Sequence, residues 1–343
     1  MIDPGELETL ARRAGLDLVG VAPAGPSPFW NAYRHWIQEG YHGDMDYLAR
    51  ADAVRRRRDP RQILPNARTV LVVGASYPSG PAPDLPPLHG RIARYAWGED
   101  YHRWLLKRLK GFLRAVVARL ETPVQWRAYV DTGPILERAW AQATGSLGWI
   151  GKNTCLIHPR LGSYFFLGVA LLDVALPPLE RPRFPTCGSC TQCLDACPTG
   201  ALVAPGVLDA RRCLAYLTIE HRGPIPEELR PKLGAWVFGC DVCQEVCPWN
   251  RKLGARPPSP LAFDGATLML PDLLRMNAKA FRARFRHSPI WRATPTGLAR
   301  NAAVVLGNLG QPAAIPALAW AAASHPDDIV REHAAWALER LRG

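Results

Sequence analysis

The stretch CGSCTQCLDACPTGAL, residues 187–202, contains cysteines at positions 187, 190, 193 and 197 and a proline directly after the last of them. This C-x2-C-x2-C-x3-C-P spacing is that of bacterial two-cluster ferredoxins, in which the first three cysteines bind one 4Fe-4S cluster. The fourth cysteine binds the neighbouring cluster, so a second set of ligands must lie elsewhere in the chain. The segment therefore predicts a ferredoxin-like domain with two 4Fe-4S clusters.

The second set of cysteines lies in GCDVCQEVCPWN, residues 239–250. It repeats the ending C-x2-C-x3-C-P, and Cys213 can supply the ligand that is missing from its front. Crossed ligation of the ferredoxin type predicts two ligand sets. Cluster one takes Cys187, Cys190, Cys193 and Cys247, and cluster two takes Cys197, Cys213, Cys240 and Cys243.

Zinc is the structural alternative, because paired C-x-x-C knuckles also bind it. A zinc site has no reason to repeat the x2-x2-x3 spacing with a proline after each last cysteine, so we favour iron and sulfide. The C-x3-C-x2-C order of radical S-adenosylmethionine enzymes does not occur in the sequence. Cys155 lies outside both sets, and its spacing alone suggests only a small buried hydrophobic residue.

Composition indicates a globular protein, with 48% hydrophobic and 21% charged residues among 343. A net charge of +12 suits a polyanionic partner, although arginine-rich proteins without such a partner are also common. The longest apolar stretch, 164–172, is far shorter than the roughly 18 residues that cross a bilayer. The N-terminal residues lack a signal-peptide pattern, so we expect a cytoplasmic protein without a membrane anchor. Because a reducing compartment disfavours disulfides, we expect the cysteines to bind metal.

Helices and short buried strands alternate before the cysteine-rich segment, which predicts an α/β domain on one sheet in a chain of the α+β or α/β class. The expected helices are 6–14, 101–121 and 135–144, and the expected strands are 16–22, 69–75, 124–130 and 162–174. A proline-rich stretch follows. We therefore predict three domains: 1–176, α/β; 177–260, ferredoxin-like; and 261–343, helical.

The C-terminal segment contains a weak internal repeat. NAAVVLGNL at 301–309 resembles HAAWALERL at 333–341, and alanine-rich amphipathic helices at such a spacing are typical of HEAT-like helical pairs. Two ordinary packed helices would give a similar pattern.

The densest polar stretch of the first domain is 129–168. Asp131 follows a predicted strand and precedes a turn, a position where an aspartate is often only a helix N-cap. Glycines at 145, 148 and 151 lead into Lys152, Asn153 and Thr154, a loop whose backbone could approach a flat ligand or a phosphate. Arg55, Arg56, Arg57 and Arg58 form a basic run, which suits a solvated helix face or a phosphate contact.

Several motifs together resemble the epoxyqueuosine reductase family. They are VDTGPILERAWAQATGSLGWIGKNT, HPRLGSYFFLG, both cysteine motifs, RRCLAYLTIEHRG and the HEAT-like tail. The resemblance implies an oxidoreductase that uses cobalamin and two 4Fe-4S clusters to reduce epoxyqueuosine to queuosine at the tRNA wobble base. It also implies an N-terminal cobalamin-binding domain and an external electron donor such as a flavodoxin or ferredoxin system. We expect a monomer.

The resemblance assigns roles to individual residues. Asp131 would donate a proton to the departing epoxide oxygen, which requires a raised pKa. The implied cobalamin contacts are Arg57, Asp131, Lys152, Asn153, Thr154, Cys155, Ile157, Ala215, Thr218, Asp241 and Val242. The D-x-H-x-x-G motif of proteins that ligate cobalt through histidine is incomplete at Asp100 and His102, because Leu105 replaces its glycine. We therefore expect base-off cobalamin without a protein histidine on cobalt, and interpret His102 as a helix-surface residue.

A tRNA-binding surface is expected within 275–300, which holds seven Lys or Arg residues and no acid. Phe281, Phe285 and Trp291 lie among them, and a basic and aromatic surface suits phosphates and unpaired loop bases. A solvated helix face is the alternative. The residues expected to contact tRNA are Arg222, which the family resemblance suggests, and Arg282, Arg284 and Arg286.

Three other functions remain open at the level of sequence. A cobalamin and 4Fe-4S reductase of another substrate, similar to reductive dehalogenases, would use the same cofactors, but those enzymes usually carry a twin-arginine export signal. A ferredoxin-type electron-transfer protein would need only the cysteines. An RNA-binding module with structural clusters is the third alternative, and redox-inactive clusters would support it.

Overall fold

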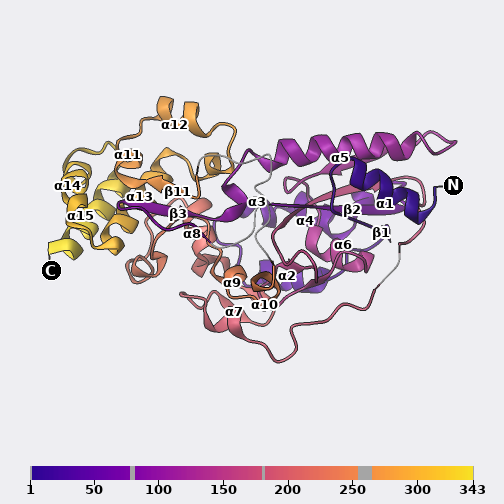
Figure 1. Ribbon diagram of the computed structural model, residues 1–343, viewed down its shortest axis with the longest axis horizontal. Coiled ribbons are helices and arrows are strands. Elements are labelled where there is room, and N and C mark those ends of the chain that lie inside the picture. The colour runs from indigo at the N-terminus through magenta and orange to yellow at the C-terminus, as the bar shows by residue number, and fades with distance from the viewer. Residues whose placement is uncertain (1, 78–81, 180–181, 254–264, 343) are drawn as a thin grey trace.

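The computed structural model describes residues 2–77, 82–179, 182–253 and 265–342 of the chain. The molecule is elongated, with the N-terminal sheet at one end and the last helices at the other (Figure 1). The predicted domain boundary at 260 lies outside the described residues. None of the helices in the described ranges combines the length and the apolar character that crossing a membrane requires.

The N-terminal sheet has the order β1-β2-β7-β4, and all its pairings are antiparallel. Its strands are β1 (Leu18–Pro23), β2 (Thr69–Ser76), β4 (Trp126–Tyr129) and β7 (Phe165–Leu172). The predicted strands thus form one sheet, but the antiparallel order distinguishes it from the parallel sheets of doubly wound α/β proteins.

Both faces of this sheet are covered, so its central strands are almost wholly apolar. Leu71 and Val73 of β2 face a core formed with α1 (Pro4–Arg13) and α5 (Tyr101–Val117). Val70 and Val72 face the opposite core, which α6 (Glu137–Thr144) closes. The alternation follows from the two-residue period of a strand. The three helices correspond to those predicted from the sequence.

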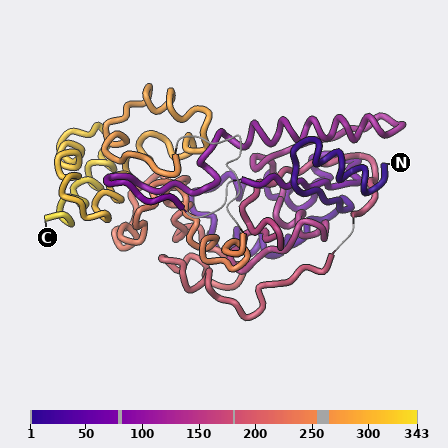
Figure 2. Tube along the Cα trace, in the orientation of Figure 1, coloured from indigo at the N-terminus to yellow at the C-terminus, as the bar shows by residue number. Residues whose placement is uncertain are grey.

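A second sheet joins distant parts of the chain. β3 (His89–Ile92) lies between β10 (Trp236–Phe238), to which it is parallel, and β11 (Thr267–Met269), to which it is antiparallel. The tube in Figure 2 shows this early segment running into the half of the molecule that holds the C-terminus. Part of the segment 1–176 therefore packs with β10, which lies between the two cysteine motifs, and with β11, which follows both.

Short elements carry the cysteines and the loops beside them. Helices α7 (Gln192–Asp195), α9 (Val242–Glu245) and α10 (Pro248–Arg251) lie together below the centre of the molecule (Figure 1). The remaining short elements are α2 (Trp30–Gln38), α3 (Asp46–Ala49), α4 (Ala51–Arg58), β5 (Trp149–Ile150), β6 (Leu156–Ile157), β8 (Leu202–Ala204), β9 (Val207–Leu208) and α8 (Leu214–Ile219).

The C-terminal region is helical. It contains α11 (Leu270–Arg275), α12 (Ala278–Phe285), α13 (Pro295–Leu309), α14 (Ile315–Ser324) and α15 (Asp328–Arg342). The two halves of the predicted repeat lie on α13 and α15, which pack closely: a β-carbon on Gly307 would lie 2.8 Å from that of Ala337. Their apolar faces share one core with α11, β10 and β11.

Candidate active site and cluster ligands

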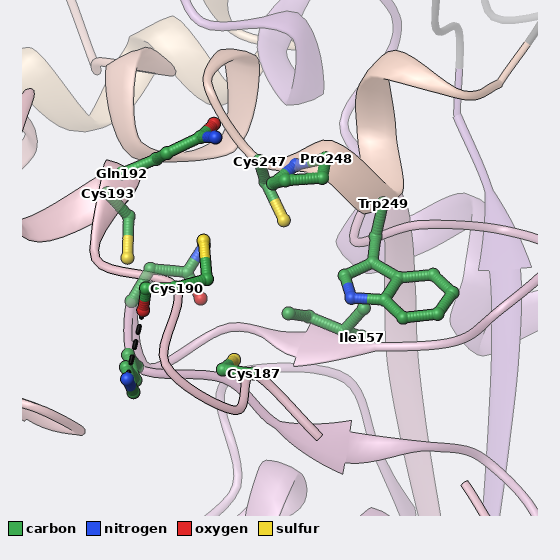
Figure 3. Close-up of a pocket in the computed structure, with 10 residues that line it drawn as sticks. Ile157, Cys187, Cys190, Gln192, Cys193, Cys247, Pro248 and Trp249 are labelled. Carbon is green, nitrogen blue, oxygen red and sulfur yellow. Dashed lines mark hydrogen bonds between the residues drawn. The ribbon is translucent and has the colours of Figure 1, made fainter. Parts of the chain in front are cut away.

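Four cysteines from two distant motifs line one cavity of about 50 Å³. Cys187, Cys190 and Cys193 come from the first motif, and Cys247 precedes α10. Figure 3 shows these cysteines around a common space, with Trp249 and Ile157 on one side. The structure therefore brings together the ligand set predicted for cluster one.

Hydrogen bonds hold the first cysteine loop in place. The Nζ of Lys152 donates to the carbonyl oxygens of Gly188 at 2.7 Å and of Cys190 at 2.9 Å. Lys152 thereby links the predicted cofactor loop to the first cysteine motif.

The second set of cysteines is also close together. Burial raises the pKa of the Cys240 thiol, and the neighbouring Cys213 and Cys197 thiols raise it further. The backbone N–H of Ala201 donates to the Cys197 sulfur at 3.3 Å. Hydrogen bonds to sulfur are one means by which proteins set the potential of an iron-sulfur cluster.

Cys155 lies against this second set. The neighbouring Cys243 thiol lowers the pKa of Cys155, and the Asn153 amide donates to the Cys243 carbonyl oxygen at 3.3 Å. At the other side of the same loop, Arg138 donates to the Thr154 carbonyl oxygen at 2.6 Å. The loop 152–157 thus connects α6 with the second cysteine motif.

Asp131 lies in a tight turn after β4, where its φ of 58° is in the left-handed region that few non-glycine residues adopt. Its Oδ2 accepts a hydrogen bond from the Tyr101 hydroxyl at 2.8 Å and lies 3.0 Å from His102 Nε2. Partial loss of surrounding water opposes the ionisation of this half-exposed carboxyl group, but the bonds from His102 and Tyr101 outweigh the effect and lower its pKa to about 2. The expected rise of this pKa concerns an Asp131 packed against cobalamin; the protein groups around Asp131, by themselves, stabilise its charged form.

His102 belongs to this site. Its side chain is only 19% exposed, and Nδ1 lies 2.6 Å from Asp100 Oδ1. The interpretation of His102 as a helix-surface residue was wrong: the first turn of α5 faces the Asp131 turn, and the imidazole lies between two carboxylates.

The C-terminal region supplies another wall of the site. Arg292 lies in the 3-10 helix Pro289–Ala293, and its Nε donates to Glu220 at 2.7 Å. The charge of Arg292 is close enough to contribute to the lowered pKa of Asp131. Arg222 donates to the Arg292 carbonyl oxygen at 2.9 Å, so it positions this segment.

Glu137 is a further acid near Asp131. Burial, with a smaller contribution from the Asp131 charge, raises its pKa to about 8. Within the part of the chain that the structure describes, Glu137 Oε1 and Arg57 Nη1 are buried polar atoms without a hydrogen-bond partner. Such atoms are rare in native interiors and suit a site that receives a polar ligand.

Other predicted cofactor contacts already have protein partners. The buried Thr218 hydroxyl donates to the Leu214 carbonyl oxygen and accepts from the Gly239 N–H. Asp241 is 1% exposed and accepts from the Arg94 N–H at 2.7 Å. Ala215 packs at the edge of the C-terminal core, and Val242 packs beside Cys213 and Cys240.

The basic surface predicted within 275–300 is partly exposed and partly buried. Arg282, Arg284 and Arg286 are exposed on and after α12, and Trp291 is 46% exposed. Phe281 and Phe285 instead face the core, so the expectation that they form a stacking surface was wrong. Only one in three or four residues of a helix can point outward in the same direction, and these two occupy the inner face.

Comparisons with known proteins point to one family. Family models match residues 57–132 as epoxyqueuosine reductase QueG, 186–250 as a 4Fe-4S double cluster binding domain, and 291–343 as HEAT repeats. The epoxyqueuosine reductase of Pseudomonas aeruginosa is 41% identical over 339 residues, which cover 96% of this chain and 92% of that protein. The chain belongs to the epoxyqueuosine reductase family.

Other epoxyqueuosine reductases give the same result. The Escherichia coli protein is 38% identical over 98% of this chain and 91% of its own length. A solved epoxyqueuosine reductase structure superposes with a TM-score of 0.87 at 32% identity, covering 98% of this chain and 90% of that one. Another structure, solved with an epoxyqueuosine-modified tRNA stem loop, superposes with a TM-score of 0.85 at 32% identity. The match covers 98% of this chain and 89% of that one. The chain is therefore an oxidoreductase of queuosine tRNA modification, with a mixed α/β fold, a 4Fe-4S binding domain and HEAT repeats.

Four residues of this epoxyqueuosine reductase site were missed by sequence reasoning: Tyr101, His102, Glu137 and Arg292. His102 lay in the incomplete cobalt-binding motif, and Glu137 lay within a quoted family motif. Arg292 lies in the predicted basic segment 275–300, and Tyr101 lies within the incomplete motif, but only tertiary packing brings either of them to Asp131.

Proposed function

We propose that the chain reduces epoxyqueuosine to queuosine at the tRNA wobble base with two 4Fe-4S clusters and base-off cobalamin. The supporting observation is the continuous path of contacts from Cys243 through Cys155 and the Thr154 backbone to Arg138 on α6. This path joins the second cysteine set to the helix that follows Asp131.

The cysteines fit the clusters because they fall into two spatial groups that match crossed ligation. Cluster one would be held by Cys187, Cys190, Cys193 and Cys247, and cluster two by Cys197, Cys213, Cys240 and Cys243. Four thiolates around one cavity suit a cubane of iron and sulfide. Iron and acid-labile sulfide analysis separates this proposal from zinc.

The residues beside the second cysteine set fit cobalamin. The unpaired Arg57 Nη1 and Glu137 Oε1 offer a donor and an acceptor for a polar ligand. The backbone of 152–157, together with Ala215, Thr218, Asp241 and Val242, would form the rest of the contact surface. When bound, cobalamin would supply a strongly reducing cobalt centre, and the clusters would be its source of single electrons.

Asp131 would deliver a proton to the departing epoxide oxygen. Converting the epoxide to an alkene and water consumes two electrons and two protons, so an acid at this position avoids a free alkoxide. The side chain of Asp131 is 52% exposed, which leaves it accessible to a substrate. Its hydrogen bonds to Tyr101 and His102 would orient the carboxyl group.

The tRNA would bind through its anticodon loop. Arg282, Arg284 and Arg286 are exposed for phosphate contacts, and the exposed Trp291 offers a ring for stacking. Arg222 would act by positioning Arg292. We expect the protein to act as a cytoplasmic monomer that receives electrons from a flavodoxin or ferredoxin system.

Anaerobic reconstitution tests the proposal. The chain is loaded with iron, sulfide and cobalamin, incubated with epoxyqueuosine tRNA and a reductant, and the wobble nucleoside is analysed by mass spectrometry. Loss of the epoxide oxygen as water, dependent on cobalamin, supports the proposal. Conversion without cobalamin, or none with full cofactor loading, contradicts it.

A further inference from the structure

Three side chains form a continuous hydrogen-bonded line at the first turn of α5. Asp100 Oδ1 lies 2.6 Å from His102 Nδ1, and His102 Nε2 lies 3.0 Å from Asp131 Oδ2. Asp100 also caps α5 by accepting the His102 N–H at 3.0 Å, so backbone and side chain fix the same geometry. An imidazole between two carboxylates is best satisfied when both ring nitrogens carry protons.

We propose that His102 stores the proton that Asp131 delivers, passing it from Nε2 to Asp131 Oδ2 and regaining a proton from water. This inference rests on the proposed function and deepens it. The transfer breaks the Nε2–H bond and forms an O–H bond on Asp131, which then protonates the departing oxygen. His102 is left neutral, with its Nδ1–H still donated to Asp100. Two passages supply the two protons of a turnover, and the electrons come from the proposed reductive activity.

The charges around the line favour this distribution of protons. Burial would lower the pKa of His102, but its bonds to Asp100 and Asp131 outweigh this and raise the pKa to about 9. With the pKa of Asp131 near 2, the resident proton at neutral pH lies on the imidazole and not on the carboxylate. An Asp131 that is ionised at rest needs a neighbouring donor to act as an acid, and His102 is within hydrogen-bond distance.

Groups from several elements act on this proton. Tyr101 donates to the same Asp131 oxygen at 2.8 Å, and Arg292 from the C-terminal region also favours an ionised Asp131. Tyr47, Tyr95 and Glu137 interact electrostatically with Asp131. Arg103, which is bonded to His287, acts on Asp100. Glu220 acts on Arg292. His102 is 19% exposed, which gives water a route to reload it.

The test compares His102→Gln and Asp100→Asn with wild type in the reconstituted holoenzyme. His35→Gln is the matched control, because His35 is an exposed histidine of α2 that pairs with Glu39. Protein labelled with ¹⁵N at histidine is titrated by NMR with cobalt in its oxidised state. In wild type we expect one imidazole to titrate near pH 9. The signal of this imidazole should be absent from His102→Gln. In Asp100→Asn the pKa of His102 should be lower by at least one unit.

Turnover provides the second measurement. We expect wild-type kcat to fall above about pH 9, where His102 loses its proton. His102→Gln should lose about 10²- to 10⁴-fold in kcat, together with that alkaline limb, at unchanged cluster and cobalamin absorbance. His35→Gln should retain the wild-type rate and profile.

Two results would overturn the inference. One is titration of His102 near the ordinary histidine value of about 6.5, and the other is an unchanged pH profile in a folded His102→Gln variant. If His102→Gln does not fold, the NMR titrations of wild type and of Asp100→Asn still test whether His102 holds the proton. If wild type makes no queuosine, the proposed function fails, while the NMR titration independently shows whether His102 holds the proton.

Discussion

Arg300 Nη1 donates a 2.6 Å hydrogen bond to the carbonyl oxygen of Gly223, although the two residues are 77 positions apart. The same nitrogen donates to the His221 carbonyl oxygen, and Nη2 donates to that of Leu217. Arg300 is 1% exposed, so this guanidinium ties α13 to the loop after α8 from inside the protein. It is a structural cation and not part of the basic surface in which the sequence placed it.

Arg300→Met should destabilise the protein by about 2 to 5 kcal/mol, because several buried carbonyl groups lose their donor. Thermal unfolding of the reconstituted protein measures the effect. Arg282→Met, on the exposed face of α12, is the control and should change stability by less than about 0.5 kcal/mol. Equal unfolding temperatures for both variants would show that Arg300 has no such role.

Asp131→Asn should keep both clusters and cobalamin but lose about 10²- to 10⁴-fold in turnover. An amide retains the shape of the carboxyl group and cannot pass a proton on. Absorbance of the cofactors and mass analysis of the wobble nucleoside measure the two properties separately. Near-normal turnover would refute the role of Asp131.

Replacing Arg282, Arg284 and Arg286 together by alanine should weaken tRNA binding and make it less sensitive to salt. Each lost phosphate contact removes about 0.7 to 0.9 from the slope of log K against log salt. Binding titrations at several salt concentrations give this slope. A matched variant removes three positive charges at Arg12, Arg13 and Lys107, on α1 and α5 at the other end of the molecule (Figure 1). An equal change in both would point to net charge instead of a binding surface.

Gly148→Ala should destabilise the loop beside the cluster-one cavity. A β-carbon at this position would lie 2.0 Å from the Ile157 carbonyl oxygen, and its φ of 127° is strained for any other residue. We expect Gly148→Ala to lower the free energy of unfolding by more than about 2 kcal/mol. Gly111 is the opposite case, because it lies in α5 with open space around it. Gly111→Ala should increase the free energy of unfolding by about 0.5 to 1 kcal/mol. Unfolding temperatures that move in the same direction would contradict this pair of predictions.

His333 should make the helical region sensitive to acid. Its Nε2 accepts the Ile225 N–H at 3.0 Å, and its Nδ1 donates to the Ile329 carbonyl oxygen, so the buried ring is neutral. Burial lowers its pKa to about 4. Because the folded pKa lies below the unfolded value of about 6.5, stability is complete above pH 6.5 and falls as the pH drops toward 4, by about 3 kcal/mol. The difference in unfolding temperature between wild type and His333→Gln, measured at each pH, should therefore shrink on acidification; a constant difference would count against the prediction.

The sequence was most informative where function depends on spacing along the chain. The cysteine motifs predicted which thiols meet, because a cluster requires a fixed set of ligands whatever the surrounding fold. Burial could not be predicted in the same way. The residues next to Arg300, Phe281 and His102 in the sequence are typical of helices and do not indicate burial. Whether each side chain is buried depends on which distant segment packs against it. The strand order likewise depends on contacts across the whole domain.

The position of β3 limits how this molecule can be divided. A cut near residue 177 would carry β3 away with the first fragment and leave β10 and β11 without the strand that joins them. The second fragment would expose two unpaired strand edges, a state prone to aggregation. The half that holds the cysteine motifs and the half that holds Asp131 are thus not interchangeable modules, and they would have to be inherited, expressed and engineered as a single piece.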